Sequence, residues 1–85
     1  MDIDGVSMII GVQIKAGRSA LNWSANTLAK HAGIASKTVR RIEATFGLPQ
    51  TTVATISAIK AALEAAGIEF IGSPSDGPGI RIHRP

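Results

Sequence analysis

The stretch that decides the fold is residues 24–43, SANTLAKHAGIASKTVRRIE. Ser24 suits the N-cap of a first helix, and Gly33 suits the left-handed position at which that helix ends. A second helix is expected at about 36–45, because apolar residues recur there at helical spacing. Two short helices joined by a tight turn that contains glycine form a helix-turn-helix, which the sequence predicts at 24–44.

The inner positions of this motif are small or apolar, as close packing of the two helices requires. Ala29 lies four residues before the turn glycine and permits a close crossing of the helices. The apolar residues expected to anchor both helices are Leu28, Ile34, Val39 and Ile42. On the second helix, Lys37, Arg40 and Arg41 cannot share that inner side, so we expect them on the open face.

Trp23 and Leu28 flank the expected cap of the first helix. They occupy the N′ and N4 positions, whose side chains form a hydrophobic staple when both are apolar. We therefore expect Trp23 to pack into the core, where it fixes the corner before the motif.

Helical patterns continue on both sides of the motif. Before it, a helix is expected at about 9–21. Its expected inner stripe is Ile9, Val12, Ala16, Ala20 and Leu21. After the loop FGLP at 46–49, Thr51 or Thr52 caps a further helix, which Gly67 ends. The expected inner stripe of this helix is Val53, Ile56, Ile59, Leu63 and Ala66.

Beyond Gly67 the pattern changes from helix to strand. The segments IEFI (68–71) and IRIH (80–83) have strand character, and the turn-rich GSPSDGPG separates them. This predicts a β-hairpin with a long loop. A lone hairpin is marginal in water, so this one either packs on the helices or pairs with a second copy of the chain.

These elements predict a mainly α fold with four to five helices and a C-terminal β-hairpin. The chain divides into a flexible arm at 1–8, a helix-turn-helix domain at 9–67 and the hairpin at 68–85. Its 85 residues, 45% of them hydrophobic, suffice for the core of one domain. The absence of cysteine, of an apolar run of 18 residues and of a basic N-terminus predicts a cytoplasmic protein with no membrane span.

The charge is unevenly distributed along the sequence. The net charge is +3, yet no acidic residue occurs between Asp4 and Glu43. The basic residues in that interval are Lys15, Arg18, Lys30, Lys37, Arg40 and Arg41. Such a distribution favours a polyanionic partner, and the alternative is a merely solvated basic face.

The sequence carries no convincing catalytic or metal-binding constellation. The two histidines, His31 and His83, are far apart, and no nucleophile or orienting carboxylate lies near them. The glycines of GSPSDGPG lack the Lys-Ser/Thr and the following helix of a P-loop. We therefore expect no enzyme activity, no cofactor, no metal and no small-molecule ligand.

Over about residues 9–66 the motif residues resemble the phage repressor and Cro family of helix-turn-helix regulators, often called XRE-like. The resemblance implies a prokaryotic transcriptional regulator, in particular a repressor. Its second motif helix would lie in the major groove of double-stranded DNA, commonly as a homodimer on a palindromic operator. The hairpin lies outside the core that the family shares, and our own hypothesis is that helix 51–66 and the hairpin build the dimer. The alternative is an antitoxin or another protein-interaction module on the same fold.

The resemblance also assigns roles to individual positions. The base-reading positions would be Ser36, Lys37 and Arg41, together with Arg40, which lies beside them and could reach either bases or phosphate. The phosphate-binding positions would be Ser24, Asn26, Lys30 and Thr38. Arg and Lys prefer guanine O6 and N7, so we expect half-sites that contain G. Arg18 and Glu43 match a family pair and are expected to form a partly buried salt bridge.

Two positions depart from the family pattern. Ala25 stands where members often carry a phosphate-binding glutamine, and Ala35 stands at the usual polar cap of the second motif helix. We expect Ser36 to take over that cap, and DNA recognition to depend more strongly on the arginines.

Overall fold

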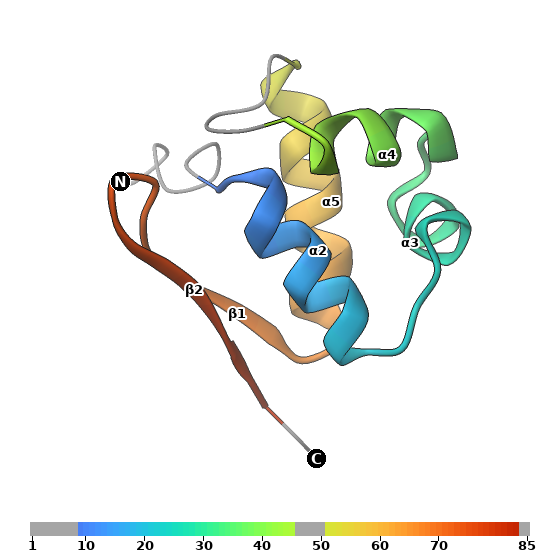
Figure 1. Cartoon of the computed structure of the whole chain (residues 1–85). Coiled ribbons are helices and arrows are strands. Elements are labelled where there is room, and N and C mark those ends of the chain that lie inside the picture. Colours follow the sequence, from blue (N-terminus) through green and yellow to red (C-terminus); the bar gives the residue numbers. More distant parts are fainter. Residues whose placement is uncertain (1–8, 46–50, 84–85) are drawn as a thin grey trace.

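The structure is a computed structural model that describes residues 9–45 and 51–83 (Figure 1). The elements in chain order are α2 (Gly11–Ala20), α3 (Ala25–Ala32), α4 (Ser36–Glu43), α5 (Val53–Ala65), β1 (Ile68–Ser73) and β2 (Asp76–Ile82). The expected fold class is confirmed: the described part of the chain is mainly helical and ends in an antiparallel hairpin. The expected arm at 1–8 and the loop at 46–49 lie outside the described residues.

The expected helix ends are present at three places. The Ser24 hydroxyl accepts a hydrogen bond from the backbone N–H of Thr27 at 3.0 Å, and Thr52 caps α5 in the same way. Gly33 has a φ of 72°, and the N–H of Ile34 reaches back to the Ala29 carbonyl at 3.0 Å. This is the hydrogen-bond pattern of a Schellman motif, which ends α3 sharply and starts the turn toward α4.

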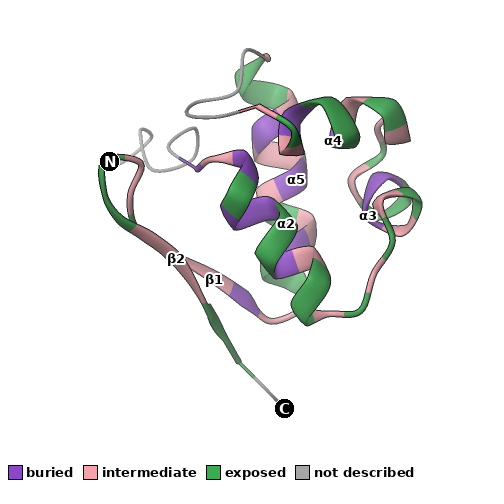
Figure 2. Ribbon diagram, viewed as in Figure 1, coloured by how far each residue is buried: buried purple, intermediate pink, exposed green. Residues whose placement is uncertain are grey.

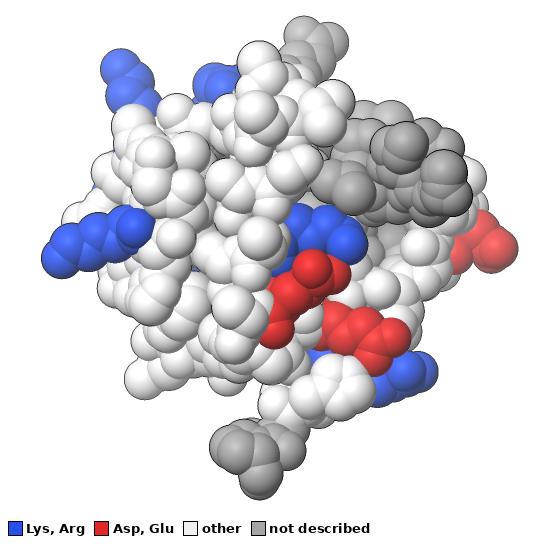
Figure 3. Space-filling model, turned by 180° about the vertical axis from the view of Figure 1, so that it is seen from behind, with Lys and Arg blue, Asp and Glu red and all other residues white. Residues whose placement is uncertain are grey.

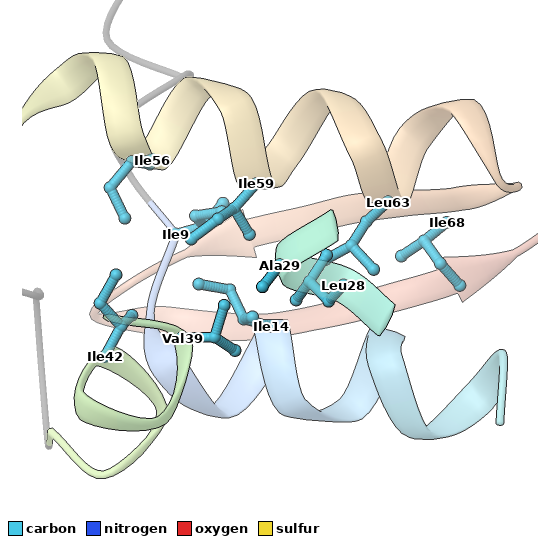
Figure 4. Packing of buried hydrophobic residues seen from close by; sticks show 10 residues of the cluster. All are labelled: Ile9, Ile14, Leu28, Ala29, Val39, Ile42, Ile56, Ile59, Leu63 and Ile68. Atoms are coloured by element: carbon cyan, nitrogen blue, oxygen red, sulfur yellow. The ribbon is translucent and has the colours of Figure 1, made fainter. Parts of the chain in front are cut away.

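One apolar core joins the four helices of residues 9–45 and 51–83 to the first strand (Figure 4). Its buried side chains are Ile9, Ile14, Leu28, Ala29, Val39, Ile42, Ile56, Ile59, Leu63 and Ile68. The α2–α5 pair lies in the middle, with α3 on one side and the hairpin on the other (Figures 1 and 4). Burying this set drives folding, because each such side chain contributes roughly 1.5–3 kcal/mol.

The predicted inner stripe of the first helix is wrong at Val12, Ala16 and Ala20. These three residues are exposed, and the buried positions of α2 are Gly11, Gln13, Ile14 and Gly17 (Figure 2). The reason is close packing: a Cβ on Gly11 would overlap the carbonyl oxygen of Ile42, and one on Gly17 would press on Ile68. Two glycines, a glutamine and Ile14 therefore form the buried face, and the face that was expected to be buried is exposed.

The predicted stripe of α5 is right at Ile56, Ile59 and Leu63, which are buried. It is wrong at Val53, which is 62% exposed. Val53 is the first helical residue after the Thr52 cap, and the buried residues of α5 begin at Ile56.

The prediction of a long hairpin loop is also wrong. The strands pair in register from Ile68↔Ile82 to Ser73↔Asp76, so only Pro74 and Ser75 remain between them. A bulge between residues 71 and 73 interrupts the register, and Gly72 at its centre has a φ of 75°. Glycine permits that conformation at little cost, so a turn-like sequence is compatible with a strand here.

Gln13 fastens this hairpin to α2. The residue is 3% exposed, and Nε2 donates to the backbone carbonyls of Ile71 at 3.2 Å and Gly79 at 2.9 Å. Its Oε1 accepts from the N–H of Ile10 at 2.9 Å, which satisfies an otherwise open donor at the start of the helix. The buried amide is therefore fully used as a link between α2 and both strands.

None of the helices in residues 9–45 and 51–83 has the length and apolar character needed to cross a membrane.

Candidate nucleic-acid interface

Helix α4 is strongly two-sided. Val39 and Ile42 are completely buried, whereas Lys37, Arg40 and Arg41 are exposed on the opposite side. The turn 33–35 connects α4 to α3, which also packs on the same core. The structure thus brings the predicted cationic residues together on one outward helix face.

A bidentate salt bridge braces α4 from behind. Arg18 on α2 donates from Nε and Nη2 to the two carboxylate oxygens of Glu43, each at 2.8 Å. The third donor, Nη1, binds the carbonyl of Trp23 at 2.9 Å. The side chains are only 17% and 8% exposed, and hydrogen bonding to Glu43 raises the pKa of Arg18 against an opposing effect of burial. The predicted pair is present, and it locks the start and the end of the motif together.

This salt bridge also determines the charge of the surface. Glu43 is the sole acidic residue in the segment 9–45, and Arg18 neutralises it in a mostly buried position. The charged side chains that α3 and α4 expose are therefore basic: Lys30, Lys37, Arg40 and Arg41. In Figure 3 the acidic side chains gather toward the middle and right, away from the left edge where α3 and α4 lie. The basic face has no exposed carboxylate among its described residues.

The serines and the threonine predicted to contact DNA have defined structural surroundings. The Ser24 hydroxyl caps α3, and Thr38 is half-buried in the first turn of α4. The expectation that Ser36 caps α4 is wrong: Ala35 is the N-cap residue and provides no side-chain bond. Ser36 is the first helical residue, and its hydroxyl accepts a hydrogen bond from Arg40 Nη1 at 3.4 Å.

A contact that the sequence did not suggest links α3 to α4. Arg40 Nη2 donates to Oδ1 of Asn26 at 3.1 Å, across 14 residues of sequence. Asn26 lies in the first turn of α3, while Lys30 is exposed in the last turn of the same helix. The predicted phosphate-binding residue Asn26 and the predicted base-reading residue Arg40 are therefore partners of one another.

Trp23 lies at the corner between α2 and α3. It is half-buried and packs against the core, as expected. Its ring also stacks on His31, with ring centroids 4.2 Å apart and an interplanar angle of 11°. Sequence reasoning missed this pair, although His31 lies only eight residues away. The stack places the His31 ring against Trp23.

A second polar cluster lies on the hairpin, in the half of the molecule without the motif. His83 donates to Glu69 Oε1 at 2.6 Å, and Arg81 lies 3.3 Å from the same oxygen. The hydrogen bond from His83 and the charge of Arg81 lower the pKa of Glu69 below its ordinary value. Within the described residues there is no group of three or more potential His, Cys, Asp or Glu metal ligands and no pocket.

Comparison of the chain with models of known protein families and with curated proteins finds no match.

Proposed function

We propose that the protein binds double-stranded DNA through α4 and acts as a small transcriptional regulator, in particular a repressor. The observation that carries the proposal is the outward face of α4, which combines Lys37, Arg40 and Arg41 with a fully buried opposite side. An α-helix fits the major groove, where lysine and arginine recognise guanine. The site of action is the cytoplasm.

The proposed role of each basic residue in DNA binding follows from the exposure of its side chain. Lys37 and Arg41 reach base edges from α4, and Lys30 contacts a phosphate from the end of α3. Phosphate contacts provide most of the affinity and the base contacts provide the specificity. The Arg18–Glu43 salt bridge supports this by keeping the only carboxylate of the segment 9–45 away from the phosphates.

Binding to a labelled duplex at increasing salt tests the electrostatic part of the proposal. With about five phosphate contacts, the slope of log affinity against log salt is about −4 to −5. Lys30→Ala should weaken all duplexes alike and make the slope less steep by about 1. The matched control is Lys60→Ala, because Lys60 lies on α5 beside Glu64 and outside the basic face. An affinity that is insensitive to salt would refute the proposal.

We also propose that the protein is a homodimer joined through the hairpin and α5. The support is Ile82, which is 47% exposed on β2 of a two-stranded sheet whose outer edges have no strand partner within the described chain. Exposed backbone donors and acceptors on such an edge favour pairing with another strand. A two-fold dimer would present two copies of α4 to a palindromic site.

Sedimentation equilibrium tests the dimer. We expect twice the chain mass for the wild type and the chain mass for Ile82→Lys, because a charge on the paired edge opposes association. Val12→Lys is the matched control, since Val12 is similarly exposed but lies on α2. A wild-type monomer at high protein concentration would disprove the dimer and leave DNA binding by single copies.

The second candidate is a protein-binding module, such as an antitoxin, that uses the same hairpin edge for a different chain. The exposed Ile82 favours it equally, because strand addition does not require an identical partner. DNA binding distinguishes the two: a module of this kind needs no affinity for duplexes, and Lys37→Ala would leave its partner binding unchanged.

A further inference from the structure

We infer that Asn26 is a positioning residue that holds Arg40 for contact with the DNA backbone, so that Arg40 does not read a base. The inference rests on the proposed DNA binding and changes the roles of two residues within it. It starts from the two hydrogen bonds that the Arg40 guanidinium makes to Asn26 and Ser36.

The geometry restrains the guanidinium at both of its terminal nitrogens. Nη2 binds Asn26 Oδ1 at 3.1 Å and Nη1 lies 3.4 Å from Ser36 Oγ. Guanine recognition requires a pair of parallel N–H donors directed at O6 and N7. With one N–H of Nη1 and one N–H of Nη2 engaged by its own protein, the guanidinium has fewer parallel donor pairs left to direct at a base.

Binding of a phosphate places fewer geometric requirements on the Arg40 guanidinium than recognition of guanine does. Arginine has five N–H donors, so donors remain after the bonds to Asn26 and Ser36. Asn26 and Ser36 are neutral acceptors, and they leave the full positive charge of Arg40 in place. The side chain is therefore restrained as a cation at the junction of α3 and α4, and fewer rotamers are lost when it meets the backbone.

The contact also couples the two helices of the motif. Asn26 belongs to the first turn of α3, and Arg40 belongs to the last turn of α4. A phosphate bound by Arg40 would thereby set the orientation of α4 against α3 and the approach of Lys37 to the bases. In this arrangement Asn26 acts through Arg40 and needs no DNA contact of its own.

A double-mutant cycle on DNA affinity tests the inference with the full-length chain. Arg40→Ala should weaken binding to every duplex by about tenfold and reduce the salt slope by about 1, with the preferred sequence unchanged. Asn26→Ala should weaken binding in the same uniform way. In the Arg40→Ala background, Asn26→Ala should change the affinity by less than about twofold, because its effect passes through Arg40.

Lys37→Ala provides the matched cycle. Lys37 lies on the same exposed face, three residues before Arg40, and its loss should alter the preferred sequence. Asn26→Ala should keep its full effect in the Lys37→Ala background. Asn26→Asp is a further variant, in which the new side chain has nearly the same shape as asparagine. Its carboxylate should pair with Arg40 and repel the DNA phosphates. We therefore expect weaker binding to all sequences and a less steep salt slope, with an unchanged midpoint of thermal unfolding.

The outcomes separate this inference from the proposed function. If the wild type binds no duplex, the proposed function fails. If it binds, but Arg40→Ala changes the preferred base at one position, Arg40 reads that base and the inference is overturned. Additive effects of Asn26→Ala and Arg40→Ala would overturn it as well, because they show that Asn26 acts independently of Arg40. DNA binding by α4 stands in both of these cases.

Discussion

Arg18 has a different protein acceptor for each of its three nitrogens. Two bonds go to the Glu43 carboxylate and one to the carbonyl of Trp23, all between 2.8 and 2.9 Å. One side chain thus connects α2, the corner before α3 and the end of α4. Because the pair is largely withdrawn from solvent, the loss of either partner leaves a charge that water cannot fully hydrate.

We therefore expect Glu43→Gln to lower the free energy of unfolding by about 2 to 3 kcal/mol, measured by urea or thermal denaturation. The matched control is Glu64→Gln, which removes an exposed i,i+4 ion pair with Lys60 on α5. That change should cost no more than about 0.5 kcal/mol. Equal stability losses in the two variants would show that the Arg18–Glu43 pair has no special structural role.

Individual residues differ in how far their roles could be predicted. Gly33 was predictable because a left-handed helix end favours glycine, and Ser24 was predictable because its cap is local. The bond between Asn26 and Arg40 was not, because it depends on the crossing of two helices and joins residues 14 positions apart. The partnership of Asn26 and Arg40 therefore could not be predicted from the sequence.

At the scale of elements, the hairpin depends on α2 for its position. Gln13 binds one carbonyl on each strand, at Ile71 and Gly79. The strands are short and include the bulge glycine Gly72, so their own pairing is marginal. The hydrogen bonds of the buried Gln13 amide offset this weakness. They explain why the turn-rich sequence GSPSDGPG forms paired strands on both sides of the two-residue turn at 74–75.

Gln13→Leu keeps most of the side-chain volume but removes all three hydrogen bonds. We expect a loss of about 2 kcal/mol in the free energy of unfolding and faster hydrogen exchange of hairpin amides than of α4 amides. Val12→Ala, on the exposed side of the same helix, should change stability by less than about 0.5 kcal/mol. Unchanged hairpin exchange in Gln13→Leu would mean that the amide does not anchor the strands.

The Glu69 carboxylate should make the hairpin sensitive to acid. Its pKa is lowered in the folded chain, first by the hydrogen bond from His83 and further by Arg81. A lowered carboxyl pKa stabilises the folded hairpin above the ordinary glutamate pKa, and this stabilisation is lost as pH falls through the lowered value. By NMR titration, His83→Ala should move the Glu69 pKa upward, and Arg81→Ala should move it less. An unchanged Glu69 pKa in His83→Ala would contradict this assignment.

Periodicity predicted the existence of each described helix better than it predicted their inner faces. It identified Ile56, Ile59 and Leu63 correctly because these are large apolar residues at helical spacing. It failed on α2, where close approach to Ile42 and Ile68 places glycines inside and leaves Val12 outside. Close contacts between elements select small residues, and a hydrophobic pattern does not indicate them.

At the scale of the whole molecule, charge is divided between two halves. The segment 9–45 has six basic residues and one acidic residue, whereas the segment 51–83 has two basic and three acidic residues. In the proposed function, this asymmetry would favour an approach of DNA to the segment 9–45, which includes α3 and α4. The hairpin, which the proposed dimer would use, lies on the other side of the α2–α5 pair.

Selection of bound duplexes from a random pool by the purified full-length protein tests the central claim most directly. DNA recognition by α4 predicts enrichment of a G-containing half-site, repeated as a palindrome if the dimer forms. Lys37→Ala should relax the preference within that half-site. Recovery of duplexes with no enriched motif, or the same motif after replacement of both Lys37 and Arg41 by alanine, would contradict the claim that α4 reads DNA sequence.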